Sequence, residues 1–232
     1  MAYRSRELSV AVSEAVAEAS GAPVDVRRPE HVLSILVAEG TAWVGASNVA
    51  DNLSAWAGGA AVYARDPAQV SRSELKLLEA IEAFGLELPR GGRALDLGAS
   101  PGGWTRVLRE AGLEVVAVDP GDLHPSVAGD PRVDHRRTTA GVYLSSAQDR
   151  YDVIVNDLRM DAHRACRLMV RFARLAGPGC IGVTTIKLPR ANGARVAGQA
   201  LDILRAGWDV PVARNLFHNR SEITAMLVAR PT

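Results

Sequence analysis

The sequence is almost without lysine. Of its 27 Lys and Arg residues, two are lysines, Lys76 and Lys187, which leaves 25 arginines. An ordinary solvated cation in this chain is therefore an arginine. Arginine cannot lose its proton in a protein, whereas lysine is a compact point charge that can. The two lysines are candidates for positions where the chemistry of lysine is required.

The sequence also has only two cysteines, no long apolar run and no strong net charge. Cys166 and Cys180 have neither CxxC nor histidine spacing, so we expect buried reduced thiols and no metal or disulfide. The longest apolar runs, such as residues 33–38 and 181–186, fall far short of the roughly 20 residues that span a bilayer, and we expect no membrane partner. The first residues, MAYRSRELS, lack the apolar core of a signal peptide, so we expect a cytoplasmic protein. A net charge of +1 neither favours nor excludes a polyanionic partner.

The length of 232 residues allows one sizeable core and a small appendage. We predict a small α/β module with a linker over residues 1–66 and the main domain over residues 67–232. Within the module, residues 8–20 are typical of a helix. Residues 31–47 are typical of a hairpin that turns at Glu39 and Gly40, and the Gly- and Ala-rich residues 52–67 of a linker.

From about Arg93 onward, short runs rich in Val, Ile and Leu alternate with helical stretches. Runs without polar alternation indicate strands covered on both faces, as in the parallel sheet of a doubly wound α/β domain. The last two expected strands, near 210–216 and 223–229, are joined by a loop too short for a crossover helix, so we predict an antiparallel hairpin at a sheet edge. A helix over residues 71–84, with Ser71 and Glu74 as a capping box, is expected before this core.

The stretch DLGASPGGW (residues 96–104) joins a predicted strand to a helix that begins near Gly103. Its glycines, Gly98, Gly102 and Gly103, do not have the spacing of the dinucleotide fingerprint, so NAD and FAD are disfavoured. The next strand ends in Asp119, whose carboxylate can accept both hydroxyls of a ribose. A nucleoside ligand without a pyrophosphate fits both facts, and S-adenosylmethionine is the common one. The alternative is a glycine-rich turn with no ligand.

These motifs resemble the FtsJ-like RNA ribose 2′-O-methyltransferases. DLGASPGGWT is similar to their motif I, and SRSELKL, VNDLR, IKLP and HNRSEIT are similar to the segments that hold their Lys-Asp-Lys-Glu tetrad. The match runs over residues 71–229 and is strongest to the RlmM type, which acts on a cytidine ribose in large-subunit ribosomal RNA. The resemblance implies a Rossmann-like class I methyltransferase fold, α/β, with a mostly parallel seven-stranded sheet and an antiparallel last strand.

The resemblance also assigns site residues. The implied tetrad is Lys76, Asp157, Lys187 and Glu222, so both lysines of the chain fall on tetrad positions, which argues against chance. The implied contacts to S-adenosylmethionine are Ser71, Gly98, Ser100, Pro101, Gly102, Gly103, Trp104, Asp119 and Asp157. Relatives of the RlmM type usually place an acid after the third strand to bind adenine. This chain has Thr139 there, so the adenine contact falls to backbone groups or to Asp134.

We interpret Lys187 as the base that takes the ribose hydroxyl proton, Lys76 and Glu222 as orienting groups, and Asp157 as the holder of Lys187 beside the methionine end of the cofactor. Desolvation and the charge of Lys76 favour proton loss from Lys187, whereas the two carboxylates oppose it, and the sequence leaves this balance open. Taken alone, Asp157 could be a turn former and Glu222 a surface carboxylate.

Several arginines are candidate RNA contacts, because each lies within four residues of a tetrad member: Arg72, Arg159, Arg190 and Arg220. On an expected helix over residues 161–176, four more arginines fall within about 80° of arc, either as a phosphate-binding stripe or as an ordinary solvated face. These are Arg164, Arg167, Arg171 and Arg174. The segment APVDVRRPEHVLSILVAEGTAWVGAS also resembles the latter half of a THUMP domain, an RNA-binding module; a small cap on the core is the alternative.

The function that the resemblance implies is S-adenosylmethionine-dependent methylation of a ribose 2′-hydroxyl in RNA, with ribosomal RNA as the partner. A transfer RNA substrate, or a small-molecule O-methyltransferase on the same fold, is the alternative. A subunit that binds RNA or cofactor without catalysis is a third hypothesis, which the intact tetrad disfavours.

Overall fold

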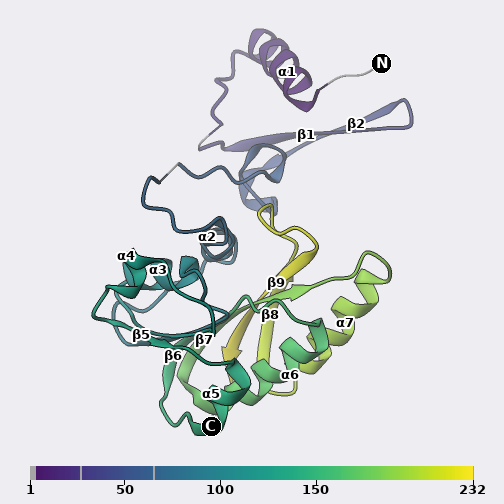
Figure 1. The fold of residues 1–232 in the computed structure, drawn as a ribbon. Coiled ribbons are helices and arrows are strands. Elements are labelled where there is room, and N and C mark those ends of the chain that lie inside the picture. Colours follow the sequence, from purple (N-terminus) through teal and green to yellow (C-terminus); the bar gives the residue numbers. More distant parts are fainter. Residues whose placement is uncertain (1–3, 27, 65, 232) are drawn as a thin grey trace. The chain divides into compact units, whose positions relative to one another are not determined.

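A computed structural model describes residues 4–26, 28–64 and 66–231 (Figure 1). Residues 1–3 of the amino-terminal segment therefore lie outside the described residues. The chain divides into two compact units, Met1–Val62 and Tyr63–Thr232, which we describe separately. No helix in the described parts of the chain is long and apolar enough to cross a membrane.

The first unit consists of a helix and a hairpin. Helix α1 (Ser5–Ser20) ends at Gly21, which adopts a left-handed φ of 70°. Strands β1 (His31–Ala38) and β2 (Thr41–Asn48) pair antiparallel. Glu39 and Gly40 have φ of 50° and 77°, as a two-residue hairpin turn requires, so the predicted hairpin is confirmed. None of the described residues of α1, β1 or β2 is buried, so this unit has no apolar core in these elements.

The segment predicted as a linker is irregular. A single-turn 3-10 helix, η1 (Val49–Asp51), directly precedes it, and a second, η2 (Ala57–Gly59), lies within it. Within η2, Gly58 has a φ of 62°, which breaks the helical path.

The second unit contains a seven-stranded sheet in the order β5-β4-β3-β6-β7-β9-β8. The first five strands in this order are parallel, and β9 runs antiparallel to both β7 and β8. The predicted hairpin at one sheet edge and the expected mostly parallel sheet are thus confirmed. The strands are β3 (Arg93–Leu97), β4 (Glu114–Val118), β5 (Val133–Arg136), β6 (Tyr151–Asn156), β7 (Ala176–Lys187), β8 (Trp208–Arg214) and β9 (Glu222–Ala229).

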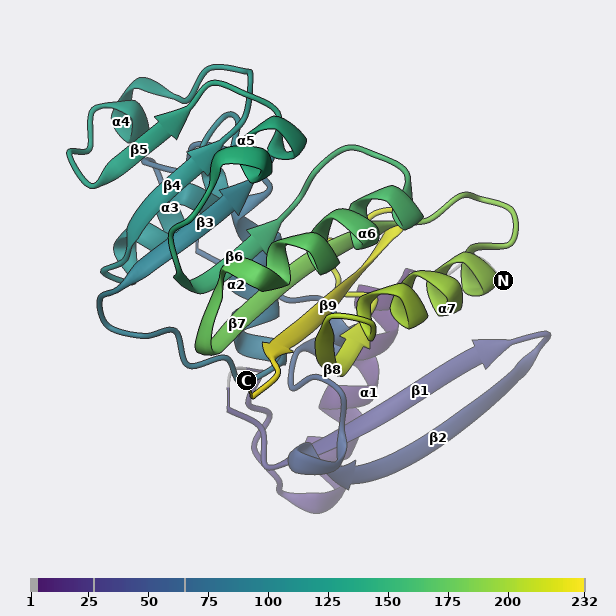
Figure 2. The same cartoon turned by 90° about the horizontal axis from the view of Figure 1, so that it is seen from below.

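Helices cover both faces of this sheet. Successive strand residues point to opposite faces, so Leu95 packs into the core beneath α5, α6 and α7, while its neighbour Ala94 packs beneath α2 and α3. Figure 2 shows α5, α6 and α7 on the near face of the sheet. The helices are α2 (Glu74–Ala83), α3 (Gly103–Glu110), α4 (Pro125–Ala128), α5 (Ala140–Ser146), α6 (Ala162–Phe172) and α7 (Gly193–Leu204), with a 3-10 turn η3 (Ala173–Leu175) after α6.

The predicted start of α2 is wrong by three residues. The helix begins at Glu74, with Ser73 as its N-cap. The Glu74 carboxylate accepts hydrogen bonds from the backbone N–H groups of Val70 (2.6 Å) and Ser71 (3.0 Å), which is half of a capping box. The Ser71 hydroxyl instead lies 2.6 Å from the Ser73 hydroxyl, because the chain at Ser71 packs against the glycine loop rather than starting the helix.

Both cysteines are buried free thiols, as expected. Burial raises the pKa of Cys166 and of Cys180 to about 12, so neither is a reactive thiolate at neutral pH.

Candidate active site

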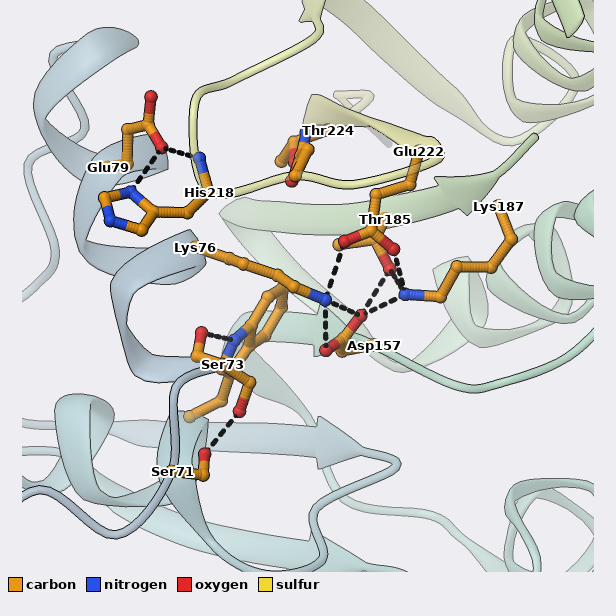
Figure 3. A network of polar contacts seen from close by, with 12 residues as sticks. Ser71, Ser73, Lys76, Glu79, Asp157, Thr185, Lys187, His218, Glu222 and Thr224 are labelled. Carbon is orange, nitrogen blue, oxygen red and sulfur yellow. Dashed lines mark hydrogen bonds and ion pairs between the residues drawn. The ribbon is translucent and has the colours of Figure 1, made fainter. Parts of the chain in front are cut away.

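Four side chains meet at the carboxyl edge of the sheet because the fold brings their elements there. Asp157 directly follows β6, and Lys187 ends β7, the next strand in the sheet. Glu222 begins β9 and is the antiparallel partner of Lys187, so the two side chains lie opposite each other. Lys76 reaches the same point from the first turn of α2. The four tetrad residues predicted from the sequence are thus brought together (Figure 3).

The two lysines share the two carboxylates. Lys76 Nζ lies 3.2 Å from Asp157 Oδ2 and 2.6 Å from Glu222 Oε1. Lys187 Nζ donates to Asp157 Oδ1 at 2.6 Å and also to Glu222 Oε2. Two positive and two negative charges therefore form a closed, formally neutral cluster. We call the cavity of about 750 Å³ that holds it the tetrad pocket.

Burial and ion pairing oppose each other within the cluster. Burial disfavours the ammonium of Lys76, but Asp157 and Glu222 outweigh it, and the pKa of Lys76 is raised. Burial likewise disfavours the carboxylate of Asp157, but Lys187 and Lys76 outweigh it, and the pKa of Asp157 is lowered. The Lys187 side chain is 26% exposed against 17% for Lys76, so Lys187 is the lysine with better access to water.

The sequence reasoning missed one member of this network. The Thr185 hydroxyl donates to Asp157 Oδ1 at 2.6 Å and accepts from Lys187 Nζ at 3.0 Å. Thr185 precedes Lys187 by two residues in β7, and residues two apart in a strand share a face. This two-residue period of a strand is the signal from which Thr185 could have been predicted.

A second missed residue, Glu79, anchors the loop that leads into β9. Its buried carboxylate accepts from the backbone N–H groups of Phe217 (2.6 Å) and His218 (2.8 Å) and from His218 Nδ1 (2.8 Å). Glu79 lies three residues after Lys76 on α2, hence on the same side of the helix. One helix therefore places both a tetrad lysine and the support of the loop that leads to Glu222.

The glycine loop lies between β3 and α3, as predicted, and is packed too closely for side chains. A Cβ on Gly98 would lie 3.1 Å from the Leu158 backbone, and one on Gly103 would lie 2.2 Å from Ser71 Oγ. Gly102 adopts a φ of 111°, which only glycine tolerates readily. Such a loop lets backbone N–H groups at the start of α3 approach a ligand directly.

The other predicted cofactor residues have different environments. Asp119 follows β4 half-buried, and Oδ1 accepts the backbone N–H of Gly121 at 2.7 Å, while its second oxygen has no partner among the described residues. Ser100 Oγ donates to the Asp122 carbonyl at 2.8 Å. Trp104 is 3% exposed and its Nε1 donates to the Ser73 carbonyl at 2.7 Å, so its ring supports the loop from the core.

The two residues considered for the adenine contact, Thr139 and Asp134, both have other partners in the structure. Thr139 is the N-cap of α5, where its hydroxyl accepts the backbone N–H of Val142. Asp134 is exposed and pairs with Arg136 at 2.6 Å, so its carboxylate is already engaged.

A buried acid beneath the glycine loop has no cationic partner in the part of the chain that the structure describes. Asp96, in β3, is 1% exposed; Oδ2 accepts the Thr105 hydroxyl at 2.7 Å, and Oδ1 has no hydrogen-bond partner among the described residues. Burial raises the pKa of Asp96 to about 7. This carboxyl group is therefore protonated below neutral pH, unlike Asp157.

Three of the four predicted RNA-contacting arginines line the tetrad pocket, namely Arg72, Arg159 and Arg220. Arg190 is exposed but does not line it. Among the described residues no group of three or more His, Cys, Asp or Glu side chains is arranged to hold a metal ion.

The sheet order, with an antiparallel β9 between β7 and β8, and the glycine loop at the carboxyl edge define a Rossmann-like class I methyltransferase fold. Residues 69–167 match the model of a family described as FtsJ-like methyltransferase. This part of the chain, residues 69–167, is therefore similar to the FtsJ-like methyltransferases.

Individual proteins and solved structures are also similar to this chain. The chain is similar to Ribosomal RNA large subunit methyltransferase M from Halorhodospira halophila, with 40% identity over 157 residues, covering 66% of this chain and 45% of that protein. The protein of the same name from Alkalilimnicola ehrlichii is 36% identical over 167 residues, covering 67% of this chain and 45% of that protein. The chain spans about half the length of these relatives. Among solved structures, a chain of a fibrillarin/Nop5p complex shares the fold, with a TM-score of 0.58, 14% identity, and coverage of 74% of this chain and 92% of that chain.

Proposed function

We propose that the protein transfers the methyl group of S-adenosylmethionine to a ribose 2′-hydroxyl in RNA, and that the RNA is that of the large ribosomal subunit. The observation that carries this proposal is the closed cluster of Lys76, Asp157, Lys187 and Glu222 inside a cavity lined by arginines. The family match and the names of the relatives support the reaction and the substrate class.

The glycine loop and Asp119 suit S-adenosylmethionine. The loop is a cradle that any Cβ at Gly98 or Gly103 would fill, and the unpartnered oxygen of Asp119 can accept a ribose hydroxyl. We assign Asp119 to the ribose, and the start of α3, at Gly102 and Gly103, to the carboxylate end of the cofactor. The bound cofactor would supply a methyl group already activated as a sulfonium.

The protein's own task is then to orient the ribose hydroxyl and to take its proton. Lys76 remains an ammonium, because its pKa is raised, and with Glu222 it orients the hydroxyl. We assign Lys187, whose Nζ lies between Asp157 and Glu222 at the tetrad pocket, as the base, and its neutral amine would accept the hydroxyl proton at Nζ. Asp157 and Thr185 hold Nζ in place before and after that transfer.

RNA phosphates would contact the arginines around the pocket, Arg72, Arg159 and Arg220, and Arg190 beyond its lining. The THUMP-like segment, residues 22–47, would add RNA contacts from the first unit. An enzyme with this substrate would act in the cytoplasm.

The test uses the purified protein, labelled S-adenosylmethionine and RNA from cells that lack the gene. After digestion to nucleosides, the label should appear in a 2′-O-methylnucleoside from large-subunit ribosomal RNA. Label in transfer RNA would show that transfer RNA, and not ribosomal RNA, is the substrate. Label on a base would refute the assignment of the methyl group to the ribose. Transfer to a soluble metabolite and not to RNA would identify a small-molecule enzyme.

A further inference from the structure

The outer face of α6 is strongly basic, and nothing in the proposed reaction uses it. Arg164, Arg167, Arg171 and Arg174, in α6 and η3, are all exposed. The opposite side of the helix, with Ala165, Met169 and Phe172, is buried against the sheet. We call these four arginines the α6 arginines.

Among the described residues, no carboxylate lies within ion-pair distance of the α6 arginines. Some other arginines of this unit do pair with acids: Arg93 with Asp149, Arg137 with Asp122, Arg205 with Asp202, and Arg230 with Asp209. The acid next to α6 in the sequence is Asp161, and its carboxylate caps the helix by accepting the backbone N–H of Arg164.

An ordinary solvated helix face mixes charges of both signs, because mixed charge avoids a strong local field. Here, α6 has the sequence AHRACRLMVRF, which contains no acid, and the neighbouring α5, AGVYLSS, contains no charge. The single acid of the other neighbouring helix, α7, is Asp202, and it pairs with Arg205. No acid of these three helices therefore compensates the positive charge of this face, which points to a polyanionic partner.

The α6 arginines continue from the tetrad pocket. Arg159 lines that pocket and lies two residues before the helix N-cap Asp161. Because β6 and β7 are parallel, α6 runs from the carboxyl edge of the sheet back to the amino edge, and its 11 residues span about 16 Å. Figure 2 shows α6 along the outside of the sheet, so the α6 arginines lead away from the pocket rim in that direction.

At its far end the stripe reaches a second cavity, of about 900 Å³, at the amino edge of the sheet. Arg150 and Arg174 both line it. The Arg150 guanidinium donates to the carbonyls of Arg174 (2.7 Å) and Ala176 (3.0 Å), so it is held in place without being neutralised. Arg230, also in the lining, is neutralised by Asp209 at 3.1 Å.

We propose that the α6 arginines and Arg150 form a second RNA-binding surface, which follows the phosphate backbone of the substrate away from the tetrad pocket. This proposal rests on the proposed function in taking RNA as the substrate. Each arginine replaces a counterion condensed on a phosphate, and release of those counterions makes the binding dependent on salt. The surface increases the affinity for RNA and sets the direction in which the RNA strand leaves the tetrad pocket. It takes no part in methyl transfer.

The experiment compares two double variants of the full chain. Arg167→Gln with Arg171→Gln removes two charges from the surface and keeps long, helix-favouring side chains. Arg137→Gln with Arg205→Gln removes two exposed charges that are already neutralised by acids. The probe is an unmodified transcript of large-subunit ribosomal RNA, and both its dissociation constant and the single-turnover methylation rate are measured from 0.1 to 1 M salt.

With about 0.7 counterions released per phosphate contact of a single strand, the first variant should bind about 25-fold more weakly at 0.1 M salt, with a logarithmic salt slope smaller by about 1.4. The control should match the parent, and the rate at saturating RNA should be unchanged in both. Parental affinity and slope in the first variant, or an equal loss in the control, would overturn the proposal. RNA binding that depends on α6 without methyl transfer would refute the proposed function while leaving this inference intact, and no RNA binding by the parent would overturn both.

Discussion

The tetrad pocket and the outer face of α6 hold cations in opposite ways. In the pocket, Lys76 and Lys187 share the carboxylates of Asp157 and Glu222, and the charges cancel within a few ångströms. On α6, four arginines have no carboxylate partner among the described residues. A cancelled charge acts only at contact distance, whereas an uncompensated one attracts phosphates over about 10 Å until salt screens it. We infer that the first arrangement serves chemistry and the second serves attraction.

Replacing a lysine of the tetrad pocket by arginine should have the largest effect on the rate of methyl transfer. Lys187→Arg keeps the positive charge but cannot accept the hydroxyl proton, and its planar fork does not fit the place of a compact ammonium. We expect single-turnover methyl transfer to fall by about 10²–10⁴, the usual cost of losing a general base, while folding and cofactor affinity stay near parental values.

Lys76→Arg is the matched comparison for that prediction. Lys76 contributes an orienting charge, which arginine partly replaces. The single-turnover rate of Lys76→Arg should therefore fall less than that of Lys187→Arg. If Lys187→Arg retains more than about a tenth of the parental rate, Lys187 is an electrostatic anchor and not the proton acceptor.

Asp119→Ala tests the cofactor side of the pocket, with an intermediate effect. Loss of a hydrogen bond from the ribose to a charged carboxylate should weaken S-adenosylmethionine binding by about 1–3 kcal/mol in calorimetry. Asp122→Ala is a suitable control, because Asp122 is exposed and pairs with Arg137. Undiminished binding by Asp119→Ala would place the ribose elsewhere.

Asp157 and Asp96 should give the free energy of unfolding opposite pH dependences. The pKa of Asp157 is lowered in the folded state, so its stabilisation is present above the unfolded value of 3.8 and is lost as pH falls through the folded pKa. The pKa of Asp96 is raised to about 7, so its stabilisation is complete below 3.8 and is lost as pH rises through about 7.

Denaturant titrations between pH 3 and 9 would resolve these contributions, with Asp157→Asn and Asp96→Asn as the variants. The Asp96→Asn profile should be flatter than the parent between roughly pH 4 and 7, and the Asp157→Asn profile flatter below roughly pH 4. Identical profiles for the parent and Asp96→Asn would show that Asp96 is ionised in the folded protein.

Much of this arrangement follows from the sequence, because strands covered on both faces leave an apolar pattern and the tetrad positions lie in recognisable motifs. Strand β5, with the sequence VDHR, has a single aliphatic residue, so no apolar run reveals it. The roles of Thr185 and Glu79 depend on register and on distant backbone, which a motif does not encode. Trp104 lies in the motif of the glycine loop, yet its ring is used for packing.

Removing the first unit should have the smallest effect. A chain that starts at Tyr63 keeps the whole seven-stranded sheet and the tilted ring contact between Tyr63 and His218, at 5.6 Å between ring centroids. We expect normal cofactor binding and an RNA affinity reduced several-fold, with a smaller salt slope. Parental affinity and slope would show that residues 1–62 do not contact RNA.

The central claim is that paired lysines do the chemistry and unpaired arginines attract the RNA. The most direct test is single-turnover methylation, measured against RNA concentration at low and high salt, for Lys187→Arg and for Arg167→Gln with Arg171→Gln. We predict that Lys187→Arg lowers the saturating rate at every salt concentration. We predict that the α6 variant reaches the parental saturating rate at every salt concentration. At low salt it should need more RNA than the parent to reach that rate, and at high salt this difference should disappear. A parental saturating rate in Lys187→Arg, or a reduced one in the α6 variant, would contradict the account.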